Sequence, residues 1–197
     1  MTVALSTQLI ALSSESIDAG MEQALAQVGK FSGDDRAFLI LFSRDGESMD
    51  TLYEWCDAGV AAQAHRVQGR PAASLPWLIG KIRAGQPVMV PDVEALPPEA
   101  SLDQDECRTE QIVSMLLLPL RFQGKVVGIL GFDTVRHPRV WDEEAQTSLQ
   151  LIADLLTSVM ARRQAEEDLR DAQQLLEKRV EERTRANERR GRAANAL

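Results

Sequence analysis

The last 37 residues of this 197-residue chain constrain its fold more than any other feature. Residues 161–197 carry 18 charged side chains, contain no aromatic residue and no proline, and hold one glycine, Gly191. A segment this polar cannot bury enough apolar surface to form its own core. Because Ala, Leu, Gln, Glu, Lys and Arg dominate it, it can still form a helix. We therefore expect a globular domain followed by a long polar helix.

The two parts of the chain also differ in charge, since the first is acidic and the second is slightly basic. The formal net charge is -8; residues 1–160 hold 22 acids and 12 bases, and residues 161–197 hold 8 acids and 10 bases. An acidic domain lacks the cationic footprint that binding to nucleic acid or to an anionic membrane requires. No apolar run approaches the roughly 20 residues that span a bilayer, and the N-terminus has no signal-peptide pattern. We expect a soluble, cytoplasmic protein that binds neither nucleic acid nor membrane.

Residues that could carry catalysis or hold a metal are few. Two cysteines, Cys56 and Cys107, are too few for a disulfide scaffold or a zinc site. The two histidines, His65 and His137, are far apart, and no acid or cysteine pattern accompanies them. We expect no metal, no cofactor and no enzyme activity in this chain. A redox sensor acting through Cys56 or Cys107 stays open as an alternative.

Hydrophobic patterning predicts an alternation of helices and strands in the first part of the chain. We expect an N-terminal helix in residues 1–30, packing on the sheet or in a dimer, an α/β core in 31–141, a helix leaving the core in 142–160, and a coiled-coil linker in 161–197. Within the core we expect strands at 36–42, 49–56, 88–90, 112–120 and 125–132, and helices at 76–82 and 98–110. This order predicts an α+β domain with a central antiparallel sheet flanked by helices.

The order and spacing of several short motifs resemble those of the GAF domain, a small-molecule sensor module of bacterial signalling proteins. The resemblance covers roughly residues 10–160 and rests on these stretches: Asp35 to Phe38, Tyr53 to Trp55, Leu75 to Trp77, Ile112 to Leu120, Gly124 to Asp133 and Arg139 to Trp141. It implies a sensory module whose following helix signals to a separate output domain. The chain ends before any ATP-binding or cyclase motif, so it looks like the sensory fragment of a longer protein.

The resemblance also implies possible ligands and outputs. Bilin-binding relatives attach the chromophore through a cysteine often followed by histidine, whereas Arg108 follows Cys107 here. The Asn-Lys-x-Asp motif common in cyclic-nucleotide-binding members is absent. We expect an unidentified small-molecule ligand and a histidine kinase output. A diguanylate cyclase output, or a ligand-free dimerisation or spacer domain, are the alternatives.

Candidate ligand-binding residues follow from the same pattern. A large aromatic residue at a strand end or on a short helix can line a pocket or fill a core. The candidates are Phe38, Trp55, Trp77 and Ser114, of which Phe38 also suits the core. Near the last hairpin, Asp133 and Arg136 could form an ion pair.

The C-terminal helix carries a broken apolar seam at spacings of three, four and seven residues. A seam of this period is how two helices supercoil in a dimer. Since an isolated polar helix is marginal in water, dimerisation would supply the missing burial. We expect a homodimer through the N- and C-terminal helices, with the candidate contacts Leu149, Ile152, Leu156, Val159, Leu169, Leu176 and Val180.

Overall fold

The computed structural model describes the backbone of residues 17–194 and the side chains of residues 18–166 and 168–180. The chain divides into two compact units, Met1–Val159 and Met160–Leu197. The N-terminal helix expected in residues 1–30 is described from Ile17 onward; its earlier part lies outside the described residues.

The first unit is built on a six-stranded sheet in the order β3-β2-β1-β6-β5-β4, with every neighbouring pair antiparallel. The strands are β1 (Arg36–Phe42), β2 (Ser48–Cys56), β3 (Arg70–Pro71), β4 (Val88–Val90), β5 (Ser114–Phe122) and β6 (Lys125–Thr134). The predicted α+β fold with a central antiparallel sheet is therefore confirmed, as are both predicted hairpins. The short strand β3 was not predicted, because two residues carry no periodicity.

The hairpin β5–β6 closes through a two-residue turn. Gln123 and Gly124 both have positive φ, 50° and 77°. Positive φ at both central positions is typical of a type I′ turn, whose twist matches that of the flanking strands. This turn fixes the register that pairs Phe122 with Lys125.

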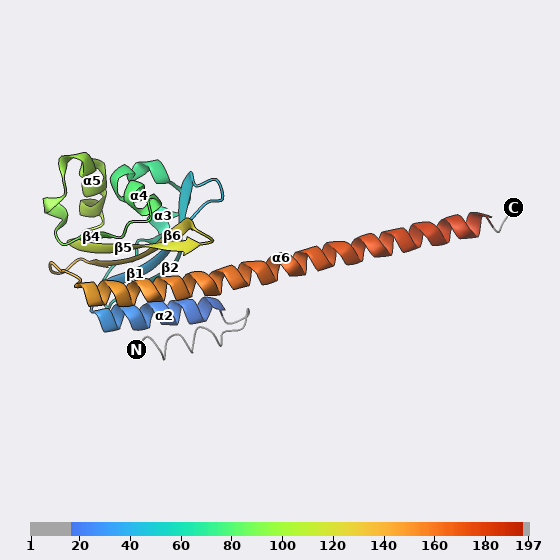
Figure 1. The fold of residues 1–197 in the computed structure, drawn as a ribbon, viewed down its shortest axis with the longest axis horizontal. Helices are drawn as coiled ribbons and strands as arrows, with labels where there is room; N and C mark the ends of the chain where they lie inside the picture. Colours follow the sequence, from blue (N-terminus) through green and yellow to red (C-terminus); the bar gives the residue numbers. More distant parts are fainter. Residues whose placement is uncertain (1–16, 195–197) are drawn as a thin grey trace. The chain divides into compact units, whose positions relative to one another are not determined.

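Helices cover both faces of the sheet (Figure 1). On one face lie α2 (Ile17–Ser32) and the first turns of α6 (Glu143–Ala194). On the other lie α3 (Ala64–Val67), α4 (Pro76–Arg83) and α5 (Ser101–Thr109), with the short 3-10 turns η2 (Ala72–Ser74), η3 (Val93–Ala95) and η4 (Pro98–Ala100). Because successive strand residues point to opposite faces, each strand supplies two cores.

The topology of the sheet explains why α4 lies across one face. Strands β3 and β4 occupy opposite edges of the sheet, so the chain between them must cross it. The fully buried carboxylate of Asp103 then ties α5 to the N-terminus of α4, accepting hydrogen bonds from the backbone N–H of Trp77 (3.2 Å) and of Leu78 (3.0 Å). A carboxylate at this position satisfies helix N–H groups that have no partner within the helix. The crossing segment is thereby held over this face of the sheet, and helices α3, α4 and α5 are together called the roof below.

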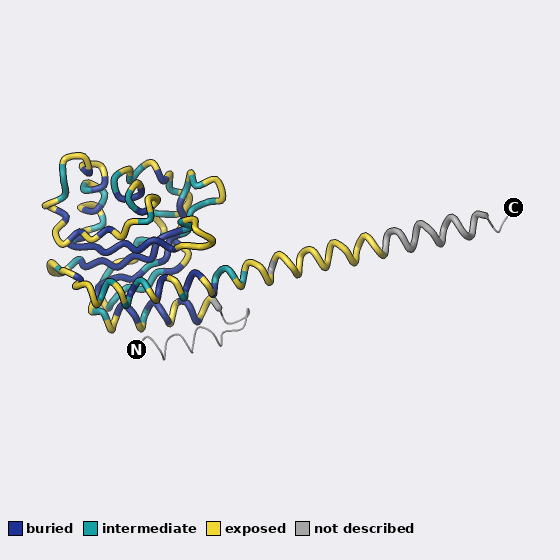
Figure 2. Tube along the Cα trace, in the orientation of Figure 1, coloured by how far each residue is buried: buried dark blue, intermediate teal, exposed yellow. Residues whose placement is uncertain are grey.

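Helix α6 differs between the two units in burial (Figure 2). In the first unit, Leu149, Ile152, Leu156 and Val159 are buried. In the second unit, Leu169, Leu176 and Val180 are exposed by 61%, 63% and 56%. Among the described residues, no helix has the length and apolar character that crossing a membrane requires.

Candidate functional site

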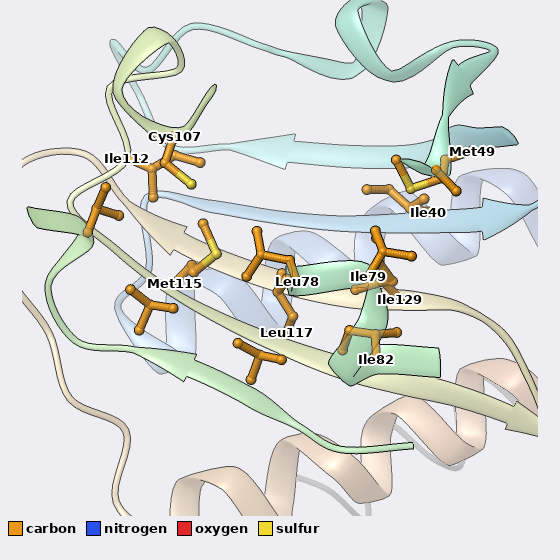
Figure 3. Packing of buried hydrophobic residues seen from close by; sticks show 14 residues of the cluster. Ile40, Met49, Leu78, Ile79, Ile82, Cys107, Ile112, Met115, Leu117 and Ile129 are labelled. Atoms are coloured by element: carbon orange, nitrogen blue, oxygen red, sulfur yellow. The ribbon is translucent and has the colours of Figure 1, made fainter. Parts of the chain in front are cut away.

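A cavity of about 80 Å³ lies between the sheet and the roof formed by α3, α4 and α5. Its walls are mostly apolar: strands β1, β5 and β6 contribute Phe38, Ile40, Met115, Leu117 and Ile129, and α4 contributes Leu78 and Ile79. Figure 3 shows Leu78 and Ile79 of the roof reaching toward Leu117 and Ile129 of the strands below. Met49 and Cys107 complete opposite ends of the same buried cluster.

The polar end of the cavity is built around a buried ion pair. Arg36 of β1 donates from Nε to Oδ1 of Asp133 on β6 at 2.8 Å, and each side chain is 2% exposed. Nη2 of Arg36 also donates to the backbone carbonyl of Glu110 at 3.2 Å. β1 and β6 are neighbours, and their register places Arg36 opposite Asp133. The pairing of Asp133 with Arg136 considered from the sequence is wrong, because Arg136 instead binds Asp35 (2.9 Å) and Asp57 (2.6 Å).

A second group of charges lies at the same end of the cavity, on α3, α5 and the edge strand β3. Arg70 binds the carboxylate of Glu106 at 2.8 Å and lies 3.7 Å from that of Glu110. Arg66 lies 3.2 Å from Glu106 and 3.9 Å from Glu110. Glu54 of β2 also lines the cavity. Its two carboxylate oxygens accept hydrogen bonds from the backbone N–H groups of Gln63 and Ala64, at the start of α3.

Burial and crowding of acids shift the protonation of two of these carboxyl groups. Burial, helped by a hydrogen bond with Glu106, raises the pKa of Glu110 to about 7 against the attraction of Arg36. Burial likewise raises the pKa of Asp133 to about 6, although Arg36 acts in the opposite direction. Perturbed titrating groups beside a cavity are typical of functional sites. Both groups are therefore poised to change charge near neutral pH.

The four candidate ligand-binding residues do not come together. Only Phe38 lines the cavity. Its ring lies against Gly131 on the neighbouring strand, where a Cβ atom would overlap it. Trp55 lies on the opposite face of the sheet, with its ring over Gly29 of α2.

Trp77 and Ser114 also lie outside the cavity lining. Trp77 lies on α4, where the ammonium group of Lys81 sits 4.8 Å from its ring centre. Ser114 is fully buried; its hydroxyl donates to the carbonyl of Pro91 at 2.5 Å and accepts from the N–H of Arg139 at 2.8 Å. Whether any of the four binds a ligand stays a prediction.

Sequence reasoning did not find the charged residues of the cavity. Arg36 was noticed only as part of a longer motif and Asp133 was paired with Arg136, whereas Arg36 and Asp133 lie 97 positions apart in the chain. Their chemistry depends on the β1–β6 register, which a single sequence does not reveal. One usable signal was present: Arg36 opens a strand whose other six residues are all apolar.

The two cysteines have unreactive surroundings. Cys107 lines the cavity and is 3% exposed, and burial raises the pKa of its thiol to about 12. Burial raises the pKa of Cys56 to about 11. Since the thiolate is the reactive form, neither environment favours nucleophilic or redox chemistry. Among the described residues, no group of His, Cys, Asp and Glu side chains could hold a metal ion.

The family model named GAF domain matches residues 16–160. The chain belongs to the GAF domain family. A search of the curated proteins finds no match.

Solved GAF structures share the fold at low sequence identity. The phycoerythrobilin-bound GAF domain of a cyanobacterial phytochrome has 17% identity and a TM-score of 0.71, over 85% of this chain and 98% of that one. The blue-light absorbing form of the Thermosynechococcus elongatus PixJ GAF domain has 18% identity and a TM-score of 0.64, over 79% and 90%. A domain of a protein assigned as a two-component sensor histidine kinase from Sinorhizobium meliloti 1021 has 22% identity and a TM-score of 0.62, over 79% and 98%.

The cavity of this GAF domain does not fit a bilin. Pockets for drug-sized ligands measure roughly 300–1,000 Å³, whereas this cavity measures about 80 Å³. An ion pair between Arg70 on the sheet edge and Glu106 on the roof lies at its polar end. Cys107, the cysteine on the roof, has a strongly raised pKa, which opposes thioether formation.

Proposed function

We propose that this GAF domain is the sensory module of a bacterial signal-transduction protein. It binds a small molecule in the cavity between the sheet and the α3–α5 roof. The observation that carries this proposal is the cavity itself, which combines an apolar wall with a buried Arg36–Asp133 pair and a titrating Glu110. Convergent polar groups at the end of an apolar cavity are the usual arrangement of a small-molecule site.

The sheet supplies a route from the cavity to the signalling helix. Met115 and Leu117 of β5 line the cavity, and the residues between and after them, Leu116 and Leu118, are buried on the opposite face, toward α2 and α6. A ligand that moves the strand therefore moves both cores together. Only a ligand that binds one packing arrangement better than the other can drive such a change.

The second part of the proposal concerns helix α6 and the output domain that it regulates. We propose that α6 pairs with a second copy of the chain and relays the change to a histidine kinase, in a cytoplasmic protein. Similarity to a domain of a protein assigned as a sensor histidine kinase supports this choice. Regulation of a diguanylate cyclase by the same module is the alternative.

A matched pair of cysteine variants tests ligand binding in the cavity. A thermal-shift screen of cyclic nucleotides and small metabolites is run on the wild-type protein, on Cys107→Met and on Cys56→Met. Methionine at 107 fills cavity space with a flexible apolar chain, whereas Cys56 lies outside the cavity lining. A sensor predicts a compound that stabilises wild type and Cys56→Met but not Cys107→Met. No stabilisation by any compound would favour a ligand-free spacer.

A further inference from the structure

The polar end of the cavity holds more carboxylates than cations. Among the described residues that line it, the acids are Glu54, Glu106, Glu110 and Asp133, and the bases are Arg36 and Arg70. Arg66 joins the glutamates from outside the lining, which still leaves one carboxylate in excess. Buried charges are stable only when they are paired and hydrogen-bonded. With all four carboxylates ionised, this end would carry one negative charge in excess, which a proton on Glu110 or a cationic ligand neutralises.

Two carboxylates at this end, those of Asp133 and Glu110, have capacity for a further donor. Asp133 is 1% exposed and uses Oδ1 for Arg36; within the described part of the chain no hydrogen bond reaches its Oδ2. Glu110 shares a hydrogen bond with Glu106, but the cations nearest to its carboxylate, Arg70 and Arg66, lie 3.7 Å and 3.9 Å away, beyond hydrogen-bonding distance. A ligand that donates hydrogen bonds and carries positive charge would satisfy both groups.

The adjoining wall suits the same kind of ligand. Phe38 stands two residues after Arg36 on the same face of β1 and lines the cavity. Its ring lies against Gly131, so the strand beside it helps to hold the ring in place. An aromatic ring attracts a cation through its negative face. Carboxylates beside a fixed ring thus form a site for an ammonium group with a short apolar body.

We infer that this cavity binds a small organic cation, whose ammonium or amidinium group meets Asp133 and Glu110 and whose short apolar part lies along Phe38. This inference rests on the proposed sensory function and names the chemical class of its ligand. The volume of about 80 Å³ is well below the roughly 300–1,000 Å³ of pockets for drug-sized ligands. The ligand is therefore compact, with a carbon chain of limited length.

Binding of such a cation depends on pH. The charged groups around Glu110 come from every element packed against it: Arg36 of β1, Glu54 of β2, Arg66 of α3, Arg70 of β3, Glu106 of α5 and Asp133 of β6. With its pKa raised to about 7, Glu110 holds a proton below neutral pH. A cation favours the ionised form, so binding releases that proton and strengthens as the pH rises.

The test titrates the whole chain with primary alkylamines from ethylamine to hexylamine, each compared with the carboxylate of the same length. Binding is measured by calorimetry at pH 6, 7 and 8, in buffers of different ionisation enthalpy. We expect an amine of optimal length to bind at least tenfold more tightly than its matched carboxylate, with proton release at pH 6. Glu110→Gln should lose about tenfold in amine affinity together with the proton release. Glu94→Gln, which alters an exposed carboxylate outside the cavity, should change neither.

Carboxylates that bind as tightly as the amines would overturn the cation inference. So would amine binding that Glu110→Gln leaves unchanged, or an absence of amine binding. The sensory function is tested separately by the thermal-shift screen. It fails only when no compound, whatever its charge, stabilises wild type more than Cys107→Met. Carboxylates or neutral compounds that bind wild type but not Cys107→Met would leave the sensor in place and remove only the cation.

Discussion

Arg36 and Asp133 form a buried ion pair of 2.8 Å at the junction of two sheet strands and one end of the cavity. The pair belongs both to the fold and to the candidate site. It joins β1 to β6, near the middle of the sheet, and both residues line the cavity. Changes at the ligand site are thereby coupled to the strands that carry the second core.

Removal of one partner of this pair should be strongly destabilising. Arg36→Met leaves the charge of Asp133 buried without its partner, which costs about 3–5 kcal/mol of unfolding free energy. The double variant Arg36→Met/Asp133→Leu removes both charges and should recover most of that loss. Urea unfolding at pH 8 measures all three proteins. An Arg36→Met variant within about 1 kcal/mol of wild type would show that the pair is not held as described.

Two helical glycines should respond in opposite ways to alanine. Gly29 of α2 lies under the ring of Trp55, which a Cβ atom would overlap, whereas Gly80 of α4 has open space around it. Gly29→Ala should cost about 1–3 kcal/mol through overpacking. Gly80→Ala should stabilise by up to about 1 kcal/mol through helix propensity. Thermal unfolding measures both; stabilisation by Gly29→Ala would contradict the packing of Trp55 on α2.

Glu110 should make the domain less stable as the pH rises. Its pKa is raised from 4.5, the value of an unperturbed glutamate, to about 7 in the folded protein. Between these values the folded protein holds a proton that the unfolded chain has lost, so unfolding free energy falls with increasing pH. Glu110→Gln removes this loss, and its stability relative to wild type should increase from pH 5 to pH 8.

Glu94→Gln is the matched control for this pH series. The hydrogen bond from Arg108 lowers the pKa of Glu94, so Glu94 stays ionised throughout the range. Its substitution should leave the slope of unfolding free energy against pH unchanged. If the unfolding free energies of wild type and Glu110→Gln have the same slope against pH, the pKa of Glu110 is not raised in the folded protein.

The proposed dimer should depend on the exposed apolar seam of α6. Leu176 is 63% exposed in the second unit and lies seven residues after Leu169. Leu176→Glu places a charge in the seam and should shift sedimentation from dimer to monomer, while the thermal midpoint of the first unit stays unchanged. Gln174→Glu adds the same charge two residues away and should remain dimeric. Identical sedimentation of the two variants would argue against pairing through this seam.

Local patterns in the sequence were sufficient for most of the fold. Strands β1, β2, β5 and β6 and helix α4 follow from apolar runs bounded by turns such as Asp45-Gly46 and Gln123-Gly124. Short elements such as β3 and α3 exist because of their neighbours and leave no periodic signal. Phe38 was placed among the ligand candidates and does line the cavity.

Trp55 shows why the rest of the site was not predictable. An aromatic residue at a strand end faces either side of the sheet, and the β-bulge between Leu39 and Ile40 alters the register along this hairpin. Trp55 therefore lies on the α2 face, where Gly29 makes room for it. The charged end of the cavity depends on contacts between six separate elements, and a single sequence contains no information on such pairing.

Methionine methyl groups give the most direct test of the claim that the cavity is a ligand site. Met49 and Met115 line it, Met21 is buried on the opposite face, and Met89 is exposed on β4. The protein is labelled with ¹³C in its methionine methyl groups and titrated with the compound that stabilises it most. We predict that the resonances of Met49 and Met115 shift saturably while that of Met89 does not. Saturable shifts confined to Met89, or none at Met49 and Met115, would contradict the account.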